Sequence, residues 1–188
     1  MKSVAVSLPM YTMKAKSVVS LISTMFNTPE IHFHLHAVEG AYIQSNRVQL
    51  VKMALDQKAD YMFFMDHDVA FAPDTLKRLL AHDKDIVFAP YNGRHAGSAS
   101  LVMGLDGVRV ESFPTDVFPV SSGPTGCMLI KMAVFDKLPK PWFHVVLNDV
   151  GQVSESEDVW FCNLAYLAGI SVWCDPSIKV GHYGEAIY

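Results

Sequence analysis

The sequence predicts one α/β domain with a doubly wound, mostly parallel sheet. Three observations indicate this class: 188 residues of which 51% are hydrophobic and 18% charged, apolar strands alternating with helical stripes along the first half, and acidic residues directly after a buried strand. A chain of this length buries enough surface to fold without disulfide or metal cross-links. Ligands of such sheets bind beyond the carboxyl ends of the strands, so we expect the functional residues there.

Strands and helices alternate through the first half of the chain. Apolar runs or period-two alternation predict strands at 3–8, 31–38, 61–65 and 86–89. Apolar residues at helical spacing predict helices at 12–26, at 43–55 and, after Pro73, around 76–80. The resulting order, β-α-β-α-β-α-β, is typical of a doubly wound sheet.

The second half is less regular. The small polar run at 92–100 predicts a mobile loop, and 101–110 predicts a small antiparallel hairpin that turns at Asp106-Gly107. The further elements expected are a strand at 128–130, a helix at 131–138, a helix that follows the acids at 155–158 and ends before Gly169, and a strand at 170–174. The sequence contains no repeat and no linker, so a single domain is expected.

The strongest functional signal is the stretch 61–69, which reads Y-M-F-F-M-D-H-D-V. Five unbroken apolar residues indicate a strand covered on both faces, and it ends at Asp66-His67-Asp68. In an extended chain, Asp66 and Asp68 project to one side while His67 points away. Two carboxylates on one side form a hard oxygen site, which suits Mg²⁺ or Mn²⁺ together with substrate phosphates. A solvated turn is the alternative for the tripeptide alone.

Three further groups each have two explanations. Arg47, in the first turns of the 43–55 helix, either serves a phosphate or carboxylate or lies on the surface. Glu157 and Asp158 open a helix, where the helix dipole favours acids, so capping alone explains them equally well. His182 stands between glycines in a late loop, which is an awkward place for a core residue and a reasonable one for a metal ligand.

Other candidates are interpreted as structural or stay open. Three histidines alternate along the 31–38 strand, and neighbours about 7 Å apart are too distant to share one ion, so we interpret them as a polar or edge face. For Trp142, in a proline-rich loop, packing is favoured over stacking on a sugar ring. Gly123 and Gly126 permit either a turn or the close approach of backbone to a ligand.

Composition limits the partners and the compartment. The net charge of −4 argues against wide nucleic-acid binding, which requires clustered Lys and Arg, so any phosphate partner is expected to be small and held by a metal. The three cysteines are far apart in apolar surroundings, which indicates reduced core residues. No segment approaches the ~20 apolar residues of a membrane span, so a soluble, cytoplasmic protein is expected.

In their order these motifs resemble the GT-A glycosyltransferases, and the general shape is similar to glycosyltransferase family 2. The motifs that carry the resemblance are the apolar strand running into Asp66-x-Asp68, the pair Glu157-Asp158 that opens a helix, and Gly-His182-Tyr-Gly. Asn46-Arg47 and the T-G-C-M-L-I run at 125–130 also resemble this family. The resemblance covers nearly the whole chain and implies the GT-A fold, with a nucleotide-binding half at 1–90 and an acceptor and catalytic half at 91–188.

The resemblance also implies roles for individual residues. Asp66 and Asp68, completed by His182, would hold the Mn²⁺ or Mg²⁺ that bridges the donor diphosphate. Asp158, with Glu157 as its neighbour, would deprotonate the acceptor hydroxyl. The residues implied to contact the donor nucleotide are Pro9, Tyr11, Glu39, Arg47, Asp66 and His67. Glu39 departs from the family pattern, in which we expect an aspartate and a serine-rich turn.

The predicted activity is metal-dependent transfer of a sugar from a UDP- or GDP-sugar to an acceptor hydroxyl, with inversion expected from a base opposite the leaving group. The expected partners are the nucleotide sugar and a carbohydrate or other hydroxyl acceptor, with no nucleic acid. Two alternatives stay open. One is a sugar-phosphate nucleotidyltransferase, disfavoured because 9–12 reads Pro-Met-Tyr-Thr instead of a Gly-rich basic loop. The other is a catalytically silent nucleotide-sugar-binding protein.

Overall fold

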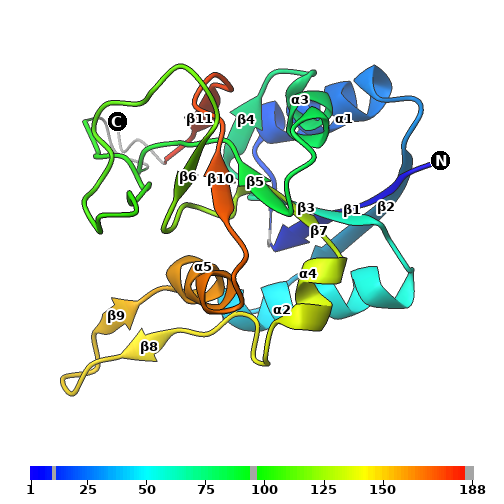
Figure 1. Ribbon diagram of the computed structural model, residues 1–188. Helices are drawn as coiled ribbons and strands as arrows, with labels where there is room; N and C mark the ends of the chain where they lie inside the picture. Colours follow the sequence, from blue (N-terminus) through cyan, green and yellow to red (C-terminus); the bar gives the residue numbers. More distant parts are fainter. Residues whose placement is uncertain (10–11, 94–96, 185–188) are drawn as a thin grey trace.

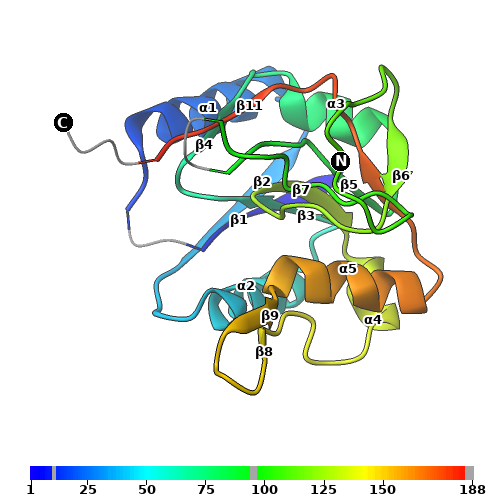
Figure 2. The same ribbon diagram turned by 90° about the vertical axis from the view of Figure 1, so that its left-hand side faces the viewer.

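A seven-stranded sheet lies between two layers of helices (Figures 1 and 2). The structure is a computed structural model, and it describes residues 1–9, 12–93 and 97–184. The strand order is β2 (His32–Val38), β1 (Ser3–Pro9), β3 (Tyr61–Met65), β7 (Cys127–Lys131), β5 (Ile86–Phe88), β10 (Val172–Cys174) and β6 (Phe118–Val120). One face is covered by α1 (Ala15–Asn27) and α3 (Thr75–Ala81), the other by α2 (Ile43–Asp56), α4 (Ala133–Lys137) and α5 (Glu157–Leu167). The predicted single α/β domain is confirmed.

Five strands of the sheet (β2, β1, β3, β5 and β10) run in one direction. β7 lies antiparallel between β3 and β5, and β6 is antiparallel to β10 at the far edge. The sheet is therefore mostly parallel, as predicted. The insertion of β7 brings its amino-terminal end, and the loop before it, next to the carboxyl ends of β3 and β5.

Two short ribbons accompany the sheet. β4 (Val69–Phe71) pairs antiparallel with β11 (Val180–His182), and β8 (Val146–Leu147) pairs with β9 (Val153–Glu155) in a hairpin that projects beside α5 (Figure 1). The hairpin predicted at 101–110 is present as a short antiparallel pairing, in which the Val110 N–H donates to the Val102 oxygen at 2.9 Å and the Gly104 N–H to the Val108 oxygen at 2.8 Å. Gly107, with φ +75°, donates its N–H to the Gly104 oxygen at 3.0 Å, and the flanking chain forms an isolated bridge.

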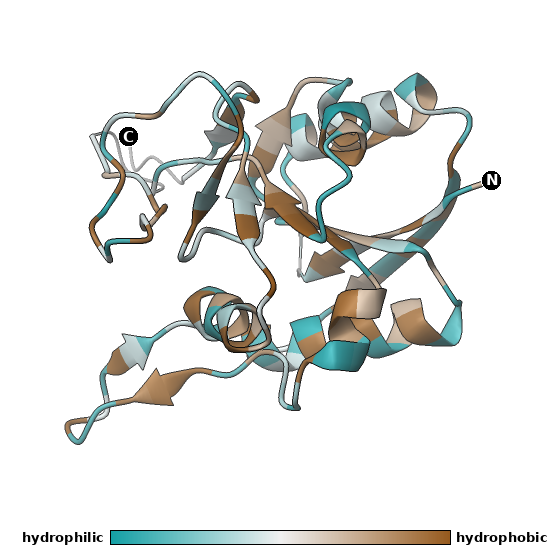
Figure 3. Ribbon diagram, in the orientation of Figure 1, coloured by the Kyte–Doolittle hydropathy of each residue, from teal (hydrophilic) through white to brown (hydrophobic). Residues whose placement is uncertain are grey.

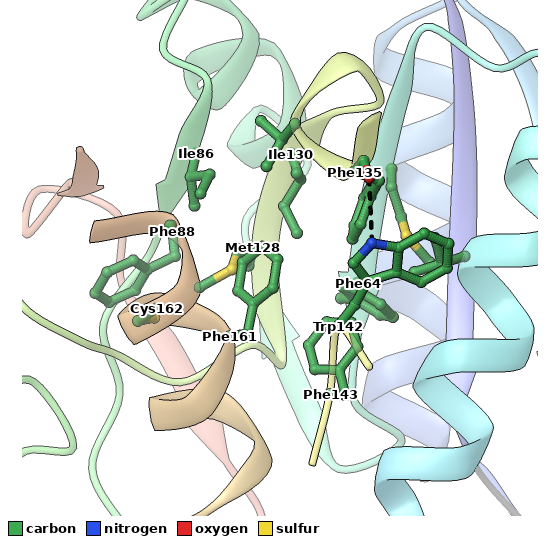
Figure 4. Close-up of a cluster of buried hydrophobic side chains, with 14 of the residues drawn as sticks. Phe64, Ile86, Phe88, Met128, Ile130, Phe135, Trp142, Phe143, Phe161 and Cys162 are labelled. Atoms are coloured by element: carbon green, nitrogen blue, oxygen red, sulfur yellow. Dashed lines mark hydrogen bonds between the residues drawn. The ribbon is translucent and has the colours of Figure 1, made fainter. Parts of the chain in front are cut away.

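β3 lies at the centre of the core, as its apolar sequence predicts. Each residue of Tyr61–Met65 is at most 7% exposed, because both faces of the strand are covered. The central strands carry the hydrophobic end of the colour scale in Figure 3. On one face Phe64 packs on Phe143, which stacks on Phe161 of α5 (Figure 4). The carboxyl end of β3 is therefore a fixed position for the acids that follow it.

Trp142 belongs to the same aromatic cluster. It is 3% exposed, and its indole N–H donates to the Phe135 carbonyl oxygen at 3.1 Å (Figure 4). A ring buried in this way cannot stack on a sugar, so the packing interpretation is confirmed. The three cysteines are also buried and free, as predicted.

Helix α1 forms where helical spacing predicts it, but its apolar stripe faces outward. The buried positions of the helix are Ser17, Ser20, Leu21 and Thr24. Val19 and Phe26, in contrast, are 62% and 82% exposed. The Ser20 hydroxyl accepts a hydrogen bond from the Phe71 N–H at 3.0 Å, which holds the polar side of the helix against β4.

β2 is an edge strand, which confirms the edge interpretation of its histidines. The ring centroids of His32 and His34 are 4.7 Å apart, and those of His34 and His36 are 6.3 Å apart. Burial, and then the neighbouring His34, lowers the pKa of His36. In the part of the chain that the structure describes, no helix is long and apolar enough to cross a membrane.

Candidate functional site

The acids after β3 lie in a turn between two strands. β3 ends at Met65, and the backbone turns at His67 and Asp68 before β4 begins. The Asp66 N–H donates to the Gly126 oxygen at 3.0 Å, so the turn starts from the β3–β7 ladder. The extended backbone assumed for this tripeptide is not formed. His67 does not point away, since its Nε2 lies 3.9 Å from Asp68 Oδ2.

Backbone pairing brings His182 to Asp68, although they are far apart in sequence. In the β4–β11 ladder His182 lies opposite Val69, and the Tyr183 N–H donates to the Asp68 oxygen at 2.8 Å. The His182 Nε2 is consequently 3.5 Å from Asp68 Oδ2. Two of the three predicted metal ligands are thus placed side by side by a two-strand ribbon.

Asp68 and His182 are of the side-chain types that could ligate a cation. The Nδ1 atom of His182 lies 2.9 Å from the Asn92 carbonyl oxygen, which fixes the ring. When Nδ1 donates this hydrogen bond, Nε2 carries a lone pair that faces a carboxylate oxygen. A shared metal ion or a proton on Nε2 makes this contact favourable. If Mn²⁺ or Mg²⁺ bound here, one oxygen and one nitrogen ligand would leave coordination positions for water and other oxygen ligands.

The third predicted ligand, Asp66, meets a different partner. Its Oδ1 is 3.1 Å from Nη2 of Arg47, and its Oδ2 accepts a hydrogen bond from the Tyr91 hydroxyl at 3.4 Å. Within residues 1–9, 12–93 and 97–184, no three His, Cys, Asp or Glu side chains are grouped to hold one metal ion. The structure therefore pairs Asp68 with His182 and places Asp66 beside a guanidinium.

Arg47 lies at the centre of three carboxylates, a group we call the Arg47 cluster (Arg47, Asp66, Glu157 and Asp158). Its Nε is 3.4 Å from Glu157 Oε1, and its Nη2 is 3.8 Å from Asp158 Oδ1 in addition to the Asp66 contact. The side chain is 2% exposed and its guanidinium carbon lies 5.1 Å from the Phe64 ring centroid. The carboxylate alternative for Arg47 is therefore the one observed, and the surface alternative is wrong.

The same contacts bear on whether Glu157 and Asp158 are simple helix-capping acids. Ser156 is the N-cap of α5, and its side chain accepts a hydrogen bond from the Val159 N–H. Glu157 and Asp158 instead direct carboxylate oxygens to Arg47. Capping is thus the task of Ser156, and the two acids are available for the site.

The pKa of Asp158 is strongly raised. Burial raises its pKa, and Glu157 and Asp66 raise it further, against the opposing effects of Arg47 and of a hydrogen bond from the Thr125 hydroxyl. The resulting pKa is about 7. A carboxylate with this pKa is suited to accept a proton at neutral pH.

Gly126 is needed for space and not for an unusual φ. A Cβ at this position would lie 2.2 Å from Tyr91 Oη and 2.4 Å from Asp66 Oδ2. The Gly126 N–H also donates to the Tyr91 hydroxyl at 3.0 Å. Gly126 lies in a turn and lets the backbone approach two side chains of the site, while close approach to a ligand stays a prediction.

Two cavities are lined by residues of this site. One, of about 440 Å³, is lined by Asp158 and Asn163 of α5 and by the chain at 101–109 and 121–124. The other, of about 330 Å³, is lined by His182, Tyr91 and Asn92. Asp158 and His182 thus each border a separate cavity.

The residues expected to contact the nucleoside lie at the same edge of the sheet. Pro9 is the last residue of β1 and is buried, and Glu39 directly follows β2 and is exposed. Tyr11 lies outside the described residues. Their nucleotide contacts remain predictions.

Sequence reasoning assigned no role to two residues of this site. Tyr91 follows β5 by three positions, and Thr125 lies two residues before β7. The rule that ligand-binding residues follow the carboxyl ends of parallel strands points to Tyr91. Thr125 belongs to the T-G-C-M-L-I run, but it lies before an antiparallel strand whose direction the sequence did not reveal, so no role was indicated for it.

Comparisons with known proteins match this chain in fold. No protein-family model and no curated protein sequence matches it. Among solved structures, A197 from STIV aligns over 98% of this chain and 87% of its own length, with a TM-score of 0.66 and 18% identity. The Drosophila beta-1,4-galactosyltransferase 7, as a mutant in complex with manganese, UDP-Gal and xylobiose, aligns over 98% and 72%, with a TM-score of 0.57 and 13% identity. The GT-A-like fold is thereby confirmed, while membership of family 2 stays a prediction.

Proposed function

We propose that this chain is a glycosyltransferase that moves a sugar from a UDP- or GDP-sugar to an acceptor hydroxyl. The observation that carries the proposal is the convergence of the Arg47 cluster and the Asp68–His182 pair at one end of the sheet. Sugar transfer needs charge stabilisation at the donor diphosphate and a base at the acceptor, and the two groups offer both. The likeness in fold to a galactosyltransferase supports this assignment.

The donor diphosphate is assigned to the Asp68–His182 pair. Mn²⁺ or Mg²⁺ bound there would supply Lewis-acid stabilisation of the charge that develops on the leaving nucleoside diphosphate. Asp68 provides an oxygen ligand and His182 a nitrogen ligand, with the contact to Asn92 orienting the imidazole. Asp66, held by Arg47, is the further candidate ligand. Pro9, Tyr11, Glu39 and His67 are proposed to line the nucleotide site.

Asp158 is proposed as the base that removes the proton of the acceptor hydroxyl. It borders the cavity of about 440 Å³, and its raised pKa suits proton transfer near neutral pH. Glu157 is its neighbour, but it is 12% exposed and bound through Arg47 Nε, which leaves it less accessible to an acceptor. A base in this cavity, opposite the leaving diphosphate, is expected to give inversion at the anomeric carbon.

Arg47 is proposed to fix the position of Asp66, near the sugar-donor site, relative to Glu157 and Asp158, near the sugar-acceptor site. One guanidinium contacts Asp66, which follows β3, and both acids at the start of α5. Its planar fork of N–H donors suits several carboxylates at once, whereas a lysine presents a single point charge. In this role Arg47 serves carboxylates of the protein and not a phosphate of the donor.

The test is calorimetric titration with UDP and GDP, with and without Mn²⁺, combined with nucleotide release from a panel of UDP- and GDP-sugars. We expect one nucleotide to bind more tightly with Mn²⁺, and Asp68→Asn and His182→Ala to lose that gain. Asp149→Asn, an exposed aspartate in the β8–β9 turn, is the matched control and should bind as the wild type does.

Three outcomes would contradict the proposal. Binding of equal strength without metal removes the assigned role of the pair. Binding without nucleotide release from any sugar donor favours a silent binding protein. Pyrophosphate release from a nucleoside triphosphate and a sugar phosphate favours a nucleotidyltransferase.

A further inference from the structure

The open edge of the sheet at β2 lacks the usual protection against strand pairing. β2 pairs with β1 over seven residues on one side, and among the described strands none pairs with its other side. Its sequence, H-F-H-L-H-A-V, contains no Lys, Arg, Asp, Glu or Pro. Exposed edges of soluble proteins are normally blunted by such charges or by proline, so this edge is a ready template for another strand.

The outward stripe of α1 adds an apolar surface beside this edge. Val18, Val19, Ile22 and Phe26 recur at helical spacing, and each is at least 36% exposed. The hydrogen bond between Ser20 and Phe71 fixes the opposite side of the helix against the protein. The stripe therefore does not turn inward without breaking that contact.

The helix stripe and the strand form one continuous surface. A cavity of about 440 Å³ is lined by Ile22, Met25 and Phe26 of α1 and by Ile31 and Phe33 at the strand. Leu35 lies opposite Val6 of β1 in the ladder, on the α1 side of the sheet, and is 54% exposed. We call this region the β2–α1 surface (Val18, Val19, Ile22, Phe26, Phe33 and Leu35).

We propose that the β2–α1 surface binds a second copy of this chain through a two-fold axis perpendicular to the sheet. Antiparallel pairing of β2 with the β2 of the other copy continues the sheet and keeps α1 of both copies on the same face, so the two apolar stripes meet above the new strand pair. A two-fold axis pairs the strand with its own copy, so residue i of one copy faces residue j of the other, which requires a strand without charges of one sign. β2 meets this requirement when its histidines are neutral.

The dimensions of the surface agree with a dimer interface. A seven-residue strand is about 23 Å long at ~3.3 Å per residue. A 13-residue helix is about 20 Å long at ~1.5 Å per residue. A standard interface takes ~800 Å² from each partner, so the strand edge and the helix stripe must both contribute to it. A membrane is a poorer occupant, because such helices carry many Lys and Arg, while α1 has only Lys16 and the chain a net charge of −4.

The test is sedimentation velocity of the full chain from ~1 to ~100 μM, the range of weak to moderate dimers. The expected species is twice 20.9 kDa. Leu35→Lys and, separately, Val19→Glu should each raise the dimer dissociation constant about tenfold or more, since each change enters the interface twice. Leu105→Lys and Val150→Lys, which are exposed and far from this surface in the fold, are the matched controls. Circular dichroism of each variant verifies folding.

A second readout tests the geometry directly. Leu35→Cys should form a disulfide between two copies under mild oxidation, whereas Val150→Cys, which lies outside the proposed interface, should not. The native cysteines are buried, so they should not form disulfides between copies. A monomer throughout the concentration range, or a dimer that resists both surface substitutions, overturns the proposal. Co-sedimentation of the monomer with phosphatidylglycerol vesicles, lost in Val19→Glu, would reassign the surface to a membrane and would equally overturn it. None of these readouts depends on glycosyl transfer.

Discussion

Asp175 and Asp158 are two aspartates of one chain with opposite electrostatic surroundings. Asp175 accepts a hydrogen bond from the Ser177 N–H at 2.9 Å and one from the Ser177 hydroxyl, and it lies 2.8 Å from His82 Nε2. Burial raises the pKa of Asp175, but these hydrogen bonds together hold it below its ordinary value. Asp158 accepts a hydrogen bond from the Thr125 hydroxyl, and its Oδ1 lies 3.8 Å from Arg47 Nη2. The pKa of Asp158 rises to about 7.

Burial raises the pKa of both aspartates, and the difference between them lies in the supply of hydrogen-bond donors. Only 3% of the Asp175 side chain is exposed, yet its donors stabilise it as an anion. Asp158 competes with Asp66 and Glu157 for one guanidinium. An aspartate with its own donors acts as a structural anchor, whereas one that shares a cation keeps its affinity for a proton and is suited to proton transfer.

The largest expected effect is on turnover in Asp158→Asn. The amide keeps the shape and can still accept from Thr125, but it cannot take a proton from the acceptor. We expect kcat to fall by about 10²–10⁴-fold, with nucleotide binding in Mn²⁺ unchanged by calorimetry. Asp175→Asn, the matched substitution in the other region, should retain most of the turnover. An equal loss of kcat in Asp158→Asn and Asp175→Asn would contradict the assignment of Asp158 as the base and Asp175 as a structural anchor.

The next effect is on stability and compares the two arginines. Arg47→Met leaves three carboxylates without their buried cation, and breaking a buried ion network by removing one partner costs about 3–5 kcal/mol. Arg78, whose side chain is 35% exposed, lies 3.8 Å from Asp175, and Arg78→Met should cost under about 1 kcal/mol. Urea unfolding of both variants checks these values. Arg47→Lys should recover part of the stability but less of the turnover, because it lacks the planar fork.

Asp175→Ala tests the anchor itself. The substitution leaves the Ser177 N–H and His82 without their acceptor, and an unsatisfied group of this kind costs about 1–3 kcal/mol. The turn at 175–178 leads into β11, so the pairing of His182 with Asp68 should weaken as well. Thermal unfolding measures the first effect and nucleotide affinity in Mn²⁺ the second. Unchanged stability would show that Asp175 is not the anchor that its hydrogen bonds indicate.

The sequence predicted the sheet class and most elements because strand and helix periodicity follows from local burial. It also selected as candidate site residues the acids Asp66, Asp68, Glu157 and Asp158 and the histidine His182. It failed where long-range pairing decides the geometry. Neither the antiparallel direction of β7 nor the β4–β11 ladder can be read from spacing, and these two features place Thr125 and His182. The exposure of the apolar stripe of α1 was not predicted for a related reason. Helical spacing shows which residues lie on one side of a helix, but it does not show what packs against that side.

The smallest effect is a difference in pH dependence between the two regions. Because the pKa of Asp158 is about 7, its basic form is depleted as pH falls below 7, and kcat at saturating donor and Mn²⁺ should decrease toward pH 5. The stabilising contribution of Asp175 has the opposite dependence. Its pKa is lowered on folding, so the contribution is complete above the unfolded value of about 3.9 and is lost only as pH falls below it. Between pH 8 and 5 the rate should therefore fall while the stability gap between wild type and Asp175→Ala stays constant. If the rate is flat over this range in an enzyme that still requires Asp158, the pKa of Asp158 lies below 5. Both aspartates are then anions between pH 5 and 8, and the proposed difference between Asp158 and Asp175 is contradicted.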